Sequence, residues 1–401
     1  MNDMNQFKYN TKSNFLDYLI LTFIIMWSGG CVTYKLFNDW PIYAFFLLLF
    51  VANSRKVNIS YKNLVPFFVV TILLFLQMFK FGGDLTTAIH YSLICFVCTL
   101  TALILRNKFA DVFVKIMLFF SVISLVFYAV DILGGHGFLL ELSNYFPQGG
   151  RETMAEFDAQ RENSRTLWLY QVANYDMKWL NNAGPFFERG RYVVFLCLAL
   201  FINLFNRQLS LKSKSSIVLL ITIITTFSTT GYIALLVIIF TYIILGSTSR
   251  AEKILCAIIF ASALPSILGL DFMTEKISNQ MNDSVEYSRF GAMAYHWGYL
   301  IQSPILGYGP YRAIALSGFL ESPNGITEAL LSFGIPGALF FFYCLYRGTR
   351  IFVSERRLLY ISCFIVLMTL SFTQTMFYSP FWFVLYGFAF CDNRHFSQII
   401  E

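Results

Sequence analysis

The chain has 401 residues, of which 57% are hydrophobic and 13% are charged, and its formal net charge is +6. A soluble protein of this length has too small a core to bury so much apolar surface, so the composition excludes an ordinary soluble domain. The apolar residues come in blocks of roughly 15 to 20, the length that crosses a bilayer as a helix. The sequence therefore predicts an all-α polytopic membrane protein, with 1–401 forming a single integral membrane domain.

The apolar blocks predict about twelve transmembrane helices in chain order. The run 215–247 is either one long tilted helix or, as we predict, two helices separated by a turn at Thr229, Thr230 and Gly231. The predicted spans are 15–34, 41–53, 64–79, 88–105, 113–133, 191–206, 215–228, 231–247, 254–270, 326–346, 358–376 and 378–391.

The distribution of Lys and Arg predicts the orientation of these spans. With both termini in the cytoplasm, the inner connections hold most of the basic residues, and the short outer loops hold only Lys35 and Lys80. Cytoplasmic loops of membrane proteins are enriched in Lys and Arg. The net charge therefore follows from the topology, and we expect no nucleic-acid partner. Two long loops, 134–190 and 271–325, are predicted on the outer side, and long loops of this kind usually carry function.

The first long loop is rich in arginine and aromatic residues. Residues 151–165 predict a solvated amphipathic helix on anionic lipid, with its charges paired locally. Arg189 and Arg191 instead lie at the mouth of the next span. They either reach lipid headgroups or bind a lipid-linked phosphate, for which the planar guanidinium is well suited.

The second long loop contains YSRFGAMAYHWGYLIQSPILGYGPYR. Its 286–302 segment predicts an amphipathic helix with Arg289 and His296 on one face, ended by Pro304. Gly307 and Gly309 are then predicted to adopt positive φ in a tight turn. If this loop returns to the membrane, Arg289 and His296 face a cavity between the spans. In the alternative arrangement they lie on an interfacial helix and face water.

The span that follows this loop opens with polar residues. Asn324, Glu328 and Ser332 are spaced four apart, which places them on one face of the predicted helix. A charge near the middle of the bilayer costs ~3 kcal/mol on insertion scales, and such residues usually face the bundle interior or water. Gly334 and Gly337 are predicted to let a neighbouring helix approach closely.

Three motifs together carry a family resemblance. They are SRFGAMAYHWGYLIQSPILGYG with its SP-x-x-G-x-G turn, the PN-x9-GxxG segment from Pro323 to Gly337, and TTFSTTGYIALL. In these motifs, and in its plan of about twelve spans with two large periplasmic loops, the chain resembles the O-antigen polymerase and ligase family. These are membrane glycosyltransferases that act on undecaprenyl-diphosphate-linked sugars. The resemblance covers most of the chain.

The resemblance implies a multi-pass protein of the bacterial inner membrane with GT-C-like architecture and inverting chemistry. It implies a lipid-linked oligosaccharide (undecaprenyl diphosphate) as substrate, with membrane lipids and a chain-length regulator protein as further partners. We expect no cofactor and no metal. Two departures bear on the assignment: Pro323 replaces the histidine of ligases, and Thr229 or Thr230 replaces an arginine at the span boundary.

These observations favour a polymerase that joins repeat units of O-antigen or a related surface polysaccharide. An O-antigen ligase that transfers polymer to lipid A-core, and a polysaccharide flippase, remain as alternatives. A flippase has short loops and internal repeats, whereas this chain has two long outer loops. The candidate catalytic residues are Arg289, His296, Glu328 and Glu321, and the candidate substrate-binding residues are Arg189, Arg191, Arg312, Asn324 and Tyr308.

Overall fold

The computed structural model describes residues 13–30, 59–146, 165–172, 180–246, 289–316, 324–353 and 356–391, with Ile254 and Ile258. For 289–292 it describes the backbone alone. The principal helices are α1 (Phe15–Gly29), α4 (Val65–Phe81), α5 (Leu85–Leu105), α6 (Phe109–Val130), α7 (His136–Ser143), α8 (Arg189–Phe205), α9 (Lys214–Thr225), α10 (Thr229–Leu245), α13 (Arg289–Gln302), α14 (Arg312–Ala315), α15 (Gly325–Gly348), α16 (Arg357–Ser371) and α17 (Pro380–Phe388).

The predicted all-α class is confirmed for the described part of the chain, where one two-stranded hairpin accompanies the helices. Two of the predicted spans, 41–53 and 254–270, fall outside the described residues except for Ile254 and Ile258. Each of the other predicted spans corresponds to one helix. The run 215–247 is two helices, but the break is at Thr226–Ser228, and Thr229–Gly231 already form the first turn of α10.

Several of these helices have the length and composition of membrane spans. The stretches Tyr61–Phe81, Leu85–Leu105, Phe109–Ser143 and Gly325–Ile351 are long and apolar enough to cross a bilayer. Four further apolar helices are shorter, namely Phe15–Gly29, Lys214–Thr225, Thr229–Leu245 and Arg357–Ser371.

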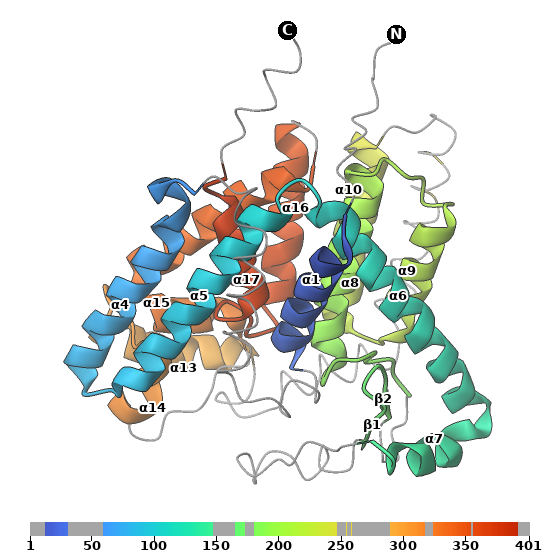
Figure 1. The fold of residues 1–401 in the computed structure, drawn as a ribbon, viewed down its shortest axis with the longest axis horizontal. Coiled ribbons are helices and arrows are strands. Elements are labelled where there is room, and N and C mark those ends of the chain that lie inside the picture. Colours follow the sequence, from blue (N-terminus) through green and yellow to red (C-terminus); the bar gives the residue numbers. More distant parts are fainter. Residues whose placement is uncertain are drawn as a thin grey trace, which may run out of the picture.

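Two helices form the centre of the bundle. Each residue of α8 from Tyr192 to Ile202 is at most 1% exposed, and the same holds for 381–386 of α17. Figure 1 shows α4, α5 and α15 on one side, α6, α8, α9 and α10 on the other, and α1 and α17 between them. Because a helix that is apolar all round must be surrounded by other helices, α8 and α17 are the core elements.

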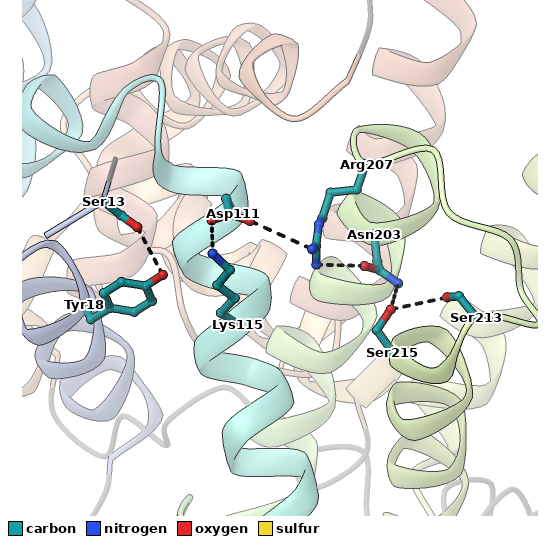
Figure 2. A network of polar contacts seen from close by, with 8 residues as sticks. All are labelled: Ser13, Tyr18, Asp111, Lys115, Asn203, Arg207, Ser213 and Ser215. Atoms are coloured by element: carbon teal, nitrogen blue, oxygen red, sulfur yellow. Dashed lines mark hydrogen bonds and ion pairs between the residues drawn. The ribbon is translucent and has the colours of Figure 1, made fainter. Parts of the chain in front are cut away.

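Polar contacts join the helix ends at one end of the bundle. Figure 2 shows Asp111 of α6 between Lys115 and Arg207. The Asp111 carboxylate lies 2.6 Å from Lys115 Nζ and 3.9 Å from Arg207 Nη2. Arg207 donates to Asn203 of α8 at 3.2 Å, and Asn203 donates to Ser215 of α9 at 3.0 Å. The connections between α5 and α6 and between α8 and α9 lie at this end, with Arg106, Lys108, Arg207 and Lys212. The sequence predicts both connections to be cytoplasmic.

The beginning of the first long loop continues α6. A π-helical turn, Asp131–Gly135, joins α6 to α7, and Gly134 within it has φ +97°. The hairpin of β1 (Arg165–Thr166) and β2 (Gln171–Val172) packs beside α7. Tyr170 donates to the buried Asp131 at 3.0 Å, which attaches the hairpin to the end of α6. Arg165 therefore lies in a strand, so its predicted place in an amphipathic helix is wrong; 147–164 lie outside the described residues.

Candidate functional site

Helix α15 is interrupted at the opposite end of the bundle. Gly334 has φ +66° and ψ 175°, and Pro336 follows it. In a regular helix the Ile335 N–H would donate to the Leu331 carbonyl. Here the Ile335 N–H donates to the Pro304 carbonyl at 2.7 Å, and the Leu331 carbonyl accepts from the Tyr308 N–H at 2.7 Å. The loop after α13, residues 303–308, therefore inserts into the break of α15.

Gln77 of α4 completes this insertion. Pro336 has no N–H, so the carbonyl four residues earlier, that of Ser332, has no helical donor. The Gln77 amide, which is fully buried, donates to the Ser332 carbonyl at 2.7 Å and to the Leu306 carbonyl at 2.6 Å. One side chain thus joins both sides of the insertion. Non-helical backbone is tolerated at membrane depth where it is buried in protein in this way.

Glycines on both sides allow the 303–308 loop to approach α15 closely. Gly307 and Gly309 have φ +64° and +58°, as the turn motif predicts. A Cβ on Gly334 would lie 2.2 Å from the Ile305 carbonyl oxygen. The expectation that Gly334 accommodates a neighbouring helix is therefore wrong, because the neighbour is the 303–308 loop. The sequence predicts 326–346 as one continuous helix, and the break at Gly334 is seen only in the structure, where the 303–308 loop fills it.

The insertion places Arg312 beside Glu328. Arg312 begins α14 four residues after Tyr308, and its guanidinium forms an ion pair with Glu328 Oε1. The same Nη1 donates to Ser332 Oγ at 3.1 Å, and Ser332 Oγ lies 3.3 Å from Glu328 Oε1. The Arg312 side chain is 17% exposed and the Glu328 side chain is 8% exposed. The predicted polar face of α15 is confirmed, and a cation from another element pairs with it.

The first turn of α15 is built to hold an acid. Asn324 is the N-cap, and its side-chain oxygen accepts from the Ile326 N–H at 3.0 Å and the Thr327 N–H at 3.3 Å. Glu328 lies in the first turn, where the helix dipole favours a negative charge. Its Oε2 is buried and has no hydrogen-bond partner among the residues that the structure describes. Among the described residues, one carboxylate oxygen of Glu328 is therefore held by Arg312 and the other has no protein partner.

Arg189 and Arg191 lie at the start of α8. Gln374 contacts both this region and the start of α15. Gln374, which follows α16, donates to Glu188 Oε1 at 3.3 Å. A Cβ on Gly325 would lie 2.2 Å from the Gln374 carbonyl oxygen, so the start of α15 lies directly against this segment. Within the described residues, the buried Arg191 Nε has no hydrogen-bond partner.

The Arg312–Glu328 pair and the 303–308 loop lie within a stretch that matches a known family, whereas Gln77, Arg191 and Gln374 lie outside it. Residues 215–342 match the family model described as O-antigen ligase. The match spans α9, α10, α13, α14 and most of α15, and it confirms the resemblance to the O-antigen polymerase and ligase family. None of the curated proteins or solved structures that were compared with the chain matches it.

The remaining candidate residues occupy different environments. His296 is fully buried in α13, and its ring meets Tyr295 edge-on at 5.2 Å. Tyr308 is buried, stacks on Phe81 at 5.0 Å, and donates its hydroxyl to the Tyr299 carbonyl at 2.9 Å. Glu321 and the side chain of Arg289 lie outside the described residues.

Sequence reasoning missed Gln77 and Gln374. Gln77 had a usable signal, because an amide inside an otherwise apolar span needs polar partners. Gln374 lies at the end of the predicted span 358–376, and nothing in the sequence indicates its contact with Glu188, 186 residues away. Among the described residues no group of three or more His, Cys, Asp or Glu side chains is placed to hold a metal ion.

The arrangement can bind an anion and accept a proton. Arg312 and Arg191 supply guanidinium groups at the same end of the bundle, and guanidinium binds phosphate oxygens well. Glu328 Oε2 supplies a buried carboxylate oxygen that can accept a proton from a hydroxyl. These are the groups needed to activate a hydroxyl and to stabilise a phosphate leaving group.

Proposed function

We propose that this protein is a polysaccharide polymerase, an inverting glycosyltransferase of the bacterial inner membrane. It joins undecaprenyl-diphosphate-linked oligosaccharide repeat units into O-antigen or a related surface polysaccharide on the periplasmic side. The observation that carries the proposal is the Arg312–Glu328 ion pair inside the O-antigen ligase domain. In this proposal the pair supplies a carboxylate as base and a guanidinium beside it, in the first turn of α15.

The proposed reaction is a single displacement at the anomeric carbon. A hydroxyl of the acceptor glycan attacks the anomeric carbon of the donor, and a new carbon–oxygen bond forms. The bond between that carbon and the phosphate oxygen breaks, and undecaprenyl diphosphate leaves with the electron pair. The acceptor proton passes to Glu328 Oε2. Attack opposite to the leaving group inverts the configuration at the anomeric carbon.

Each charged residue has a distinct part in this scheme. Arg312 holds Glu328 Oε1, which orients the carboxylate so that Oε2 is presented to the acceptor. Arg289, Arg189 and Arg191 bind the donor diphosphate. Because charge builds on the bridging oxygen as the bond breaks, guanidinium groups there stabilise the transition state more than the ground state.

A ligase is the second candidate, because the matching family model carries that description. A ligase transfers finished polymer to lipid A-core, whereas a polymerase joins repeat units to one another. Pro323 occupies the place where the resemblance puts the histidine of ligases. Glu328, only five residues later, supplies a carboxylate in place of that imidazole, and this favours the polymerase.

The glycans of a strain that lacks the gene test this function. Loss of a polymerase leaves one repeat unit on each lipid A-core, and we expect this result. Loss of a ligase leaves no units on the core, while polymer accumulates on the lipid carrier. If no repeat units reach the periplasm, the protein is a flippase and the glycosyltransferase proposal is wrong.

A further inference from the structure

Tyr378 lies in the connection between α16 and α17 and packs against the site. Its ring stacks on Phe333 at 4.5 Å with an interplanar angle of 22°, and Tyr91 meets it edge-on at 5.4 Å. Phe333 directly follows Ser332, which binds both Arg312 and Glu328. Aromatic contacts on two sides therefore hold the Tyr378 ring against the segment of α15 that carries the ion pair.

The hydroxyl of Tyr378 is buried and has no hydrogen-bond partner within the described part of the chain. Other buried tyrosines use theirs: the Tyr170 hydroxyl donates to Asp131 at 3.0 Å, and that of Tyr386 donates to the Phe377 carbonyl at 3.2 Å. A buried polar atom without a protein partner loses its hydration, and a water molecule or a bound ligand can restore the missing hydrogen bond.

Glu328 Oε2 is a second buried atom of this kind, and the two are complementary. Tyr378 stacks on Phe333, the residue after Ser332, and Ser332 Oγ donates to Glu328 Oε1 at 3.3 Å. The carboxylate oxygen accepts a hydrogen bond, and the phenol donates one. One hydroxyl group placed between them would satisfy both atoms, because a hydroxyl has one proton to donate and two lone pairs.

We propose that Glu328 Oε2 and the Tyr378 hydroxyl together bind the attacking hydroxyl of the acceptor sugar. This inference rests on the proposed function and adds a substrate-binding residue to it. The sugar hydroxyl donates its proton to Glu328 and accepts a hydrogen bond from Tyr378 through one lone pair. Its second lone pair attacks the anomeric carbon. Tyr378 keeps its proton throughout and fixes the direction of attack.

Tyr378→Phe tests the proposal by removing one oxygen atom while keeping the ring contacts. The assay uses purified protein and the lipid-linked repeat unit extracted from the deletion strain, and it measures kcat, KM and the melting temperature. Loss of a neutral hydrogen bond to substrate corresponds to a fall of about tenfold in kcat/KM. The melting temperature should not fall, because the hydroxyl has no partner among the described residues.

Tyr170→Phe is the matched control, because it also removes a buried tyrosine hydroxyl, but one that binds Asp131 at the distant hairpin. This variant should lower the melting temperature and leave kcat/KM unchanged. A melting temperature of Tyr378→Phe that falls as far as that of Tyr170→Phe would overturn the proposal, since it would reveal a structural partner for the hydroxyl.

Glu328→Gln separates this inference from the proposed function. If Glu328→Gln polymerises at the wild-type rate, the proposed function of the site is wrong. If Glu328→Gln is inactive and Tyr378→Phe is fully active, only the inference about Tyr378 is wrong. If both residues act on the same hydroxyl, adding Tyr378→Phe to Glu328→Gln produces no further loss, since residues that act as a unit are non-additive.

Discussion

Gly307 and Gly334 pack backbone against backbone where the 303–308 loop enters the broken helix α15. A Cβ on Gly307 would lie 2.4 Å from the Gly334 nitrogen, and a Cβ on Gly334 would lie 2.9 Å from the Gly307 nitrogen. Both residues have positive φ, +64° and +66°. This contact brings the loop close enough to replace the helical hydrogen bonds of α15, and it places Arg312 beside Glu328.

We predict that Gly334→Ala is strongly destabilising. With φ +66° and ψ 175°, Gly334 adopts a conformation that is essentially restricted to glycine, and strain there costs about 1–3 kcal/mol. The clash with the Ile305 carbonyl adds to this cost. The melting temperature of the purified protein should fall clearly. Gly298→Ala is the control, because a Cβ there meets nothing within 4 Å and alanine favours a helix, so its melting temperature should not fall.

Gln77→Leu should loosen the insertion while leaving the helices in place. It removes two hydrogen bonds, to the Leu306 and Ser332 carbonyls, and leaves both buried acceptors without that donor. In hydrogen exchange, the amide protons of Tyr308 and Ile335 should then exchange at least about tenfold faster, the change expected for ~1.4 kcal/mol of lost protection.

Asn63→Leu is the control for this experiment. The Asn63 amide also donates to a distant carbonyl, that of Phe390 at 2.7 Å, but at the other end of α4. Its removal should leave the Tyr308 and Ile335 amides as protected as in wild type. Equal loss of protection in the two variants would show that Gln77 has no specific role in the insertion.

The part of the fold that depends on local pattern was predictable from the sequence. Apolar blocks predicted the helices, and the four-residue spacing of Asn324, Glu328 and Ser332 predicted their common face. The break of α15 was not predicted, because Gly334 and Pro336 lie in a continuous apolar run and glycine also suits helix packing. The partner of Glu328 was not predicted either, because a tertiary insertion, rather than helical periodicity, brings Arg312 to it.

Exchanging the two charges of the ion pair should separate stability from activity. Arg312→Glu alone places a second carboxylate beside Glu328, and the repulsion between two part-buried like charges should lower the melting temperature. Adding Glu328→Arg restores opposite charges, so the melting temperature should recover. Activity should stay absent, because the base is now on the wrong element. Recovery of activity in the double variant would show that the pair is purely structural.

The proposed chemistry also requires the site to face the periplasm. Reporter fusions at Asn144 and Asn282 should both report a periplasmic location, and a fusion at Glu401 should report a cytoplasmic one, as the distribution of Lys and Arg predicts. A cytoplasmic signal from either long loop would place the Arg312–Glu328 pair on the side away from the periplasmic substrate.

Reconstituted polymerisation tests the central claim most directly. The purified protein is supplied with the lipid-linked repeat unit extracted from the deletion strain, with no lipid A-core present, and the lengths of the lipid-linked products are measured. The account predicts a ladder of chains of increasing length from the wild-type protein and only single units from Glu328→Gln. A wild-type protein that forms no chain without lipid A-core, and transfers glycan only when lipid A-core is added, would contradict the account and identify a ligase.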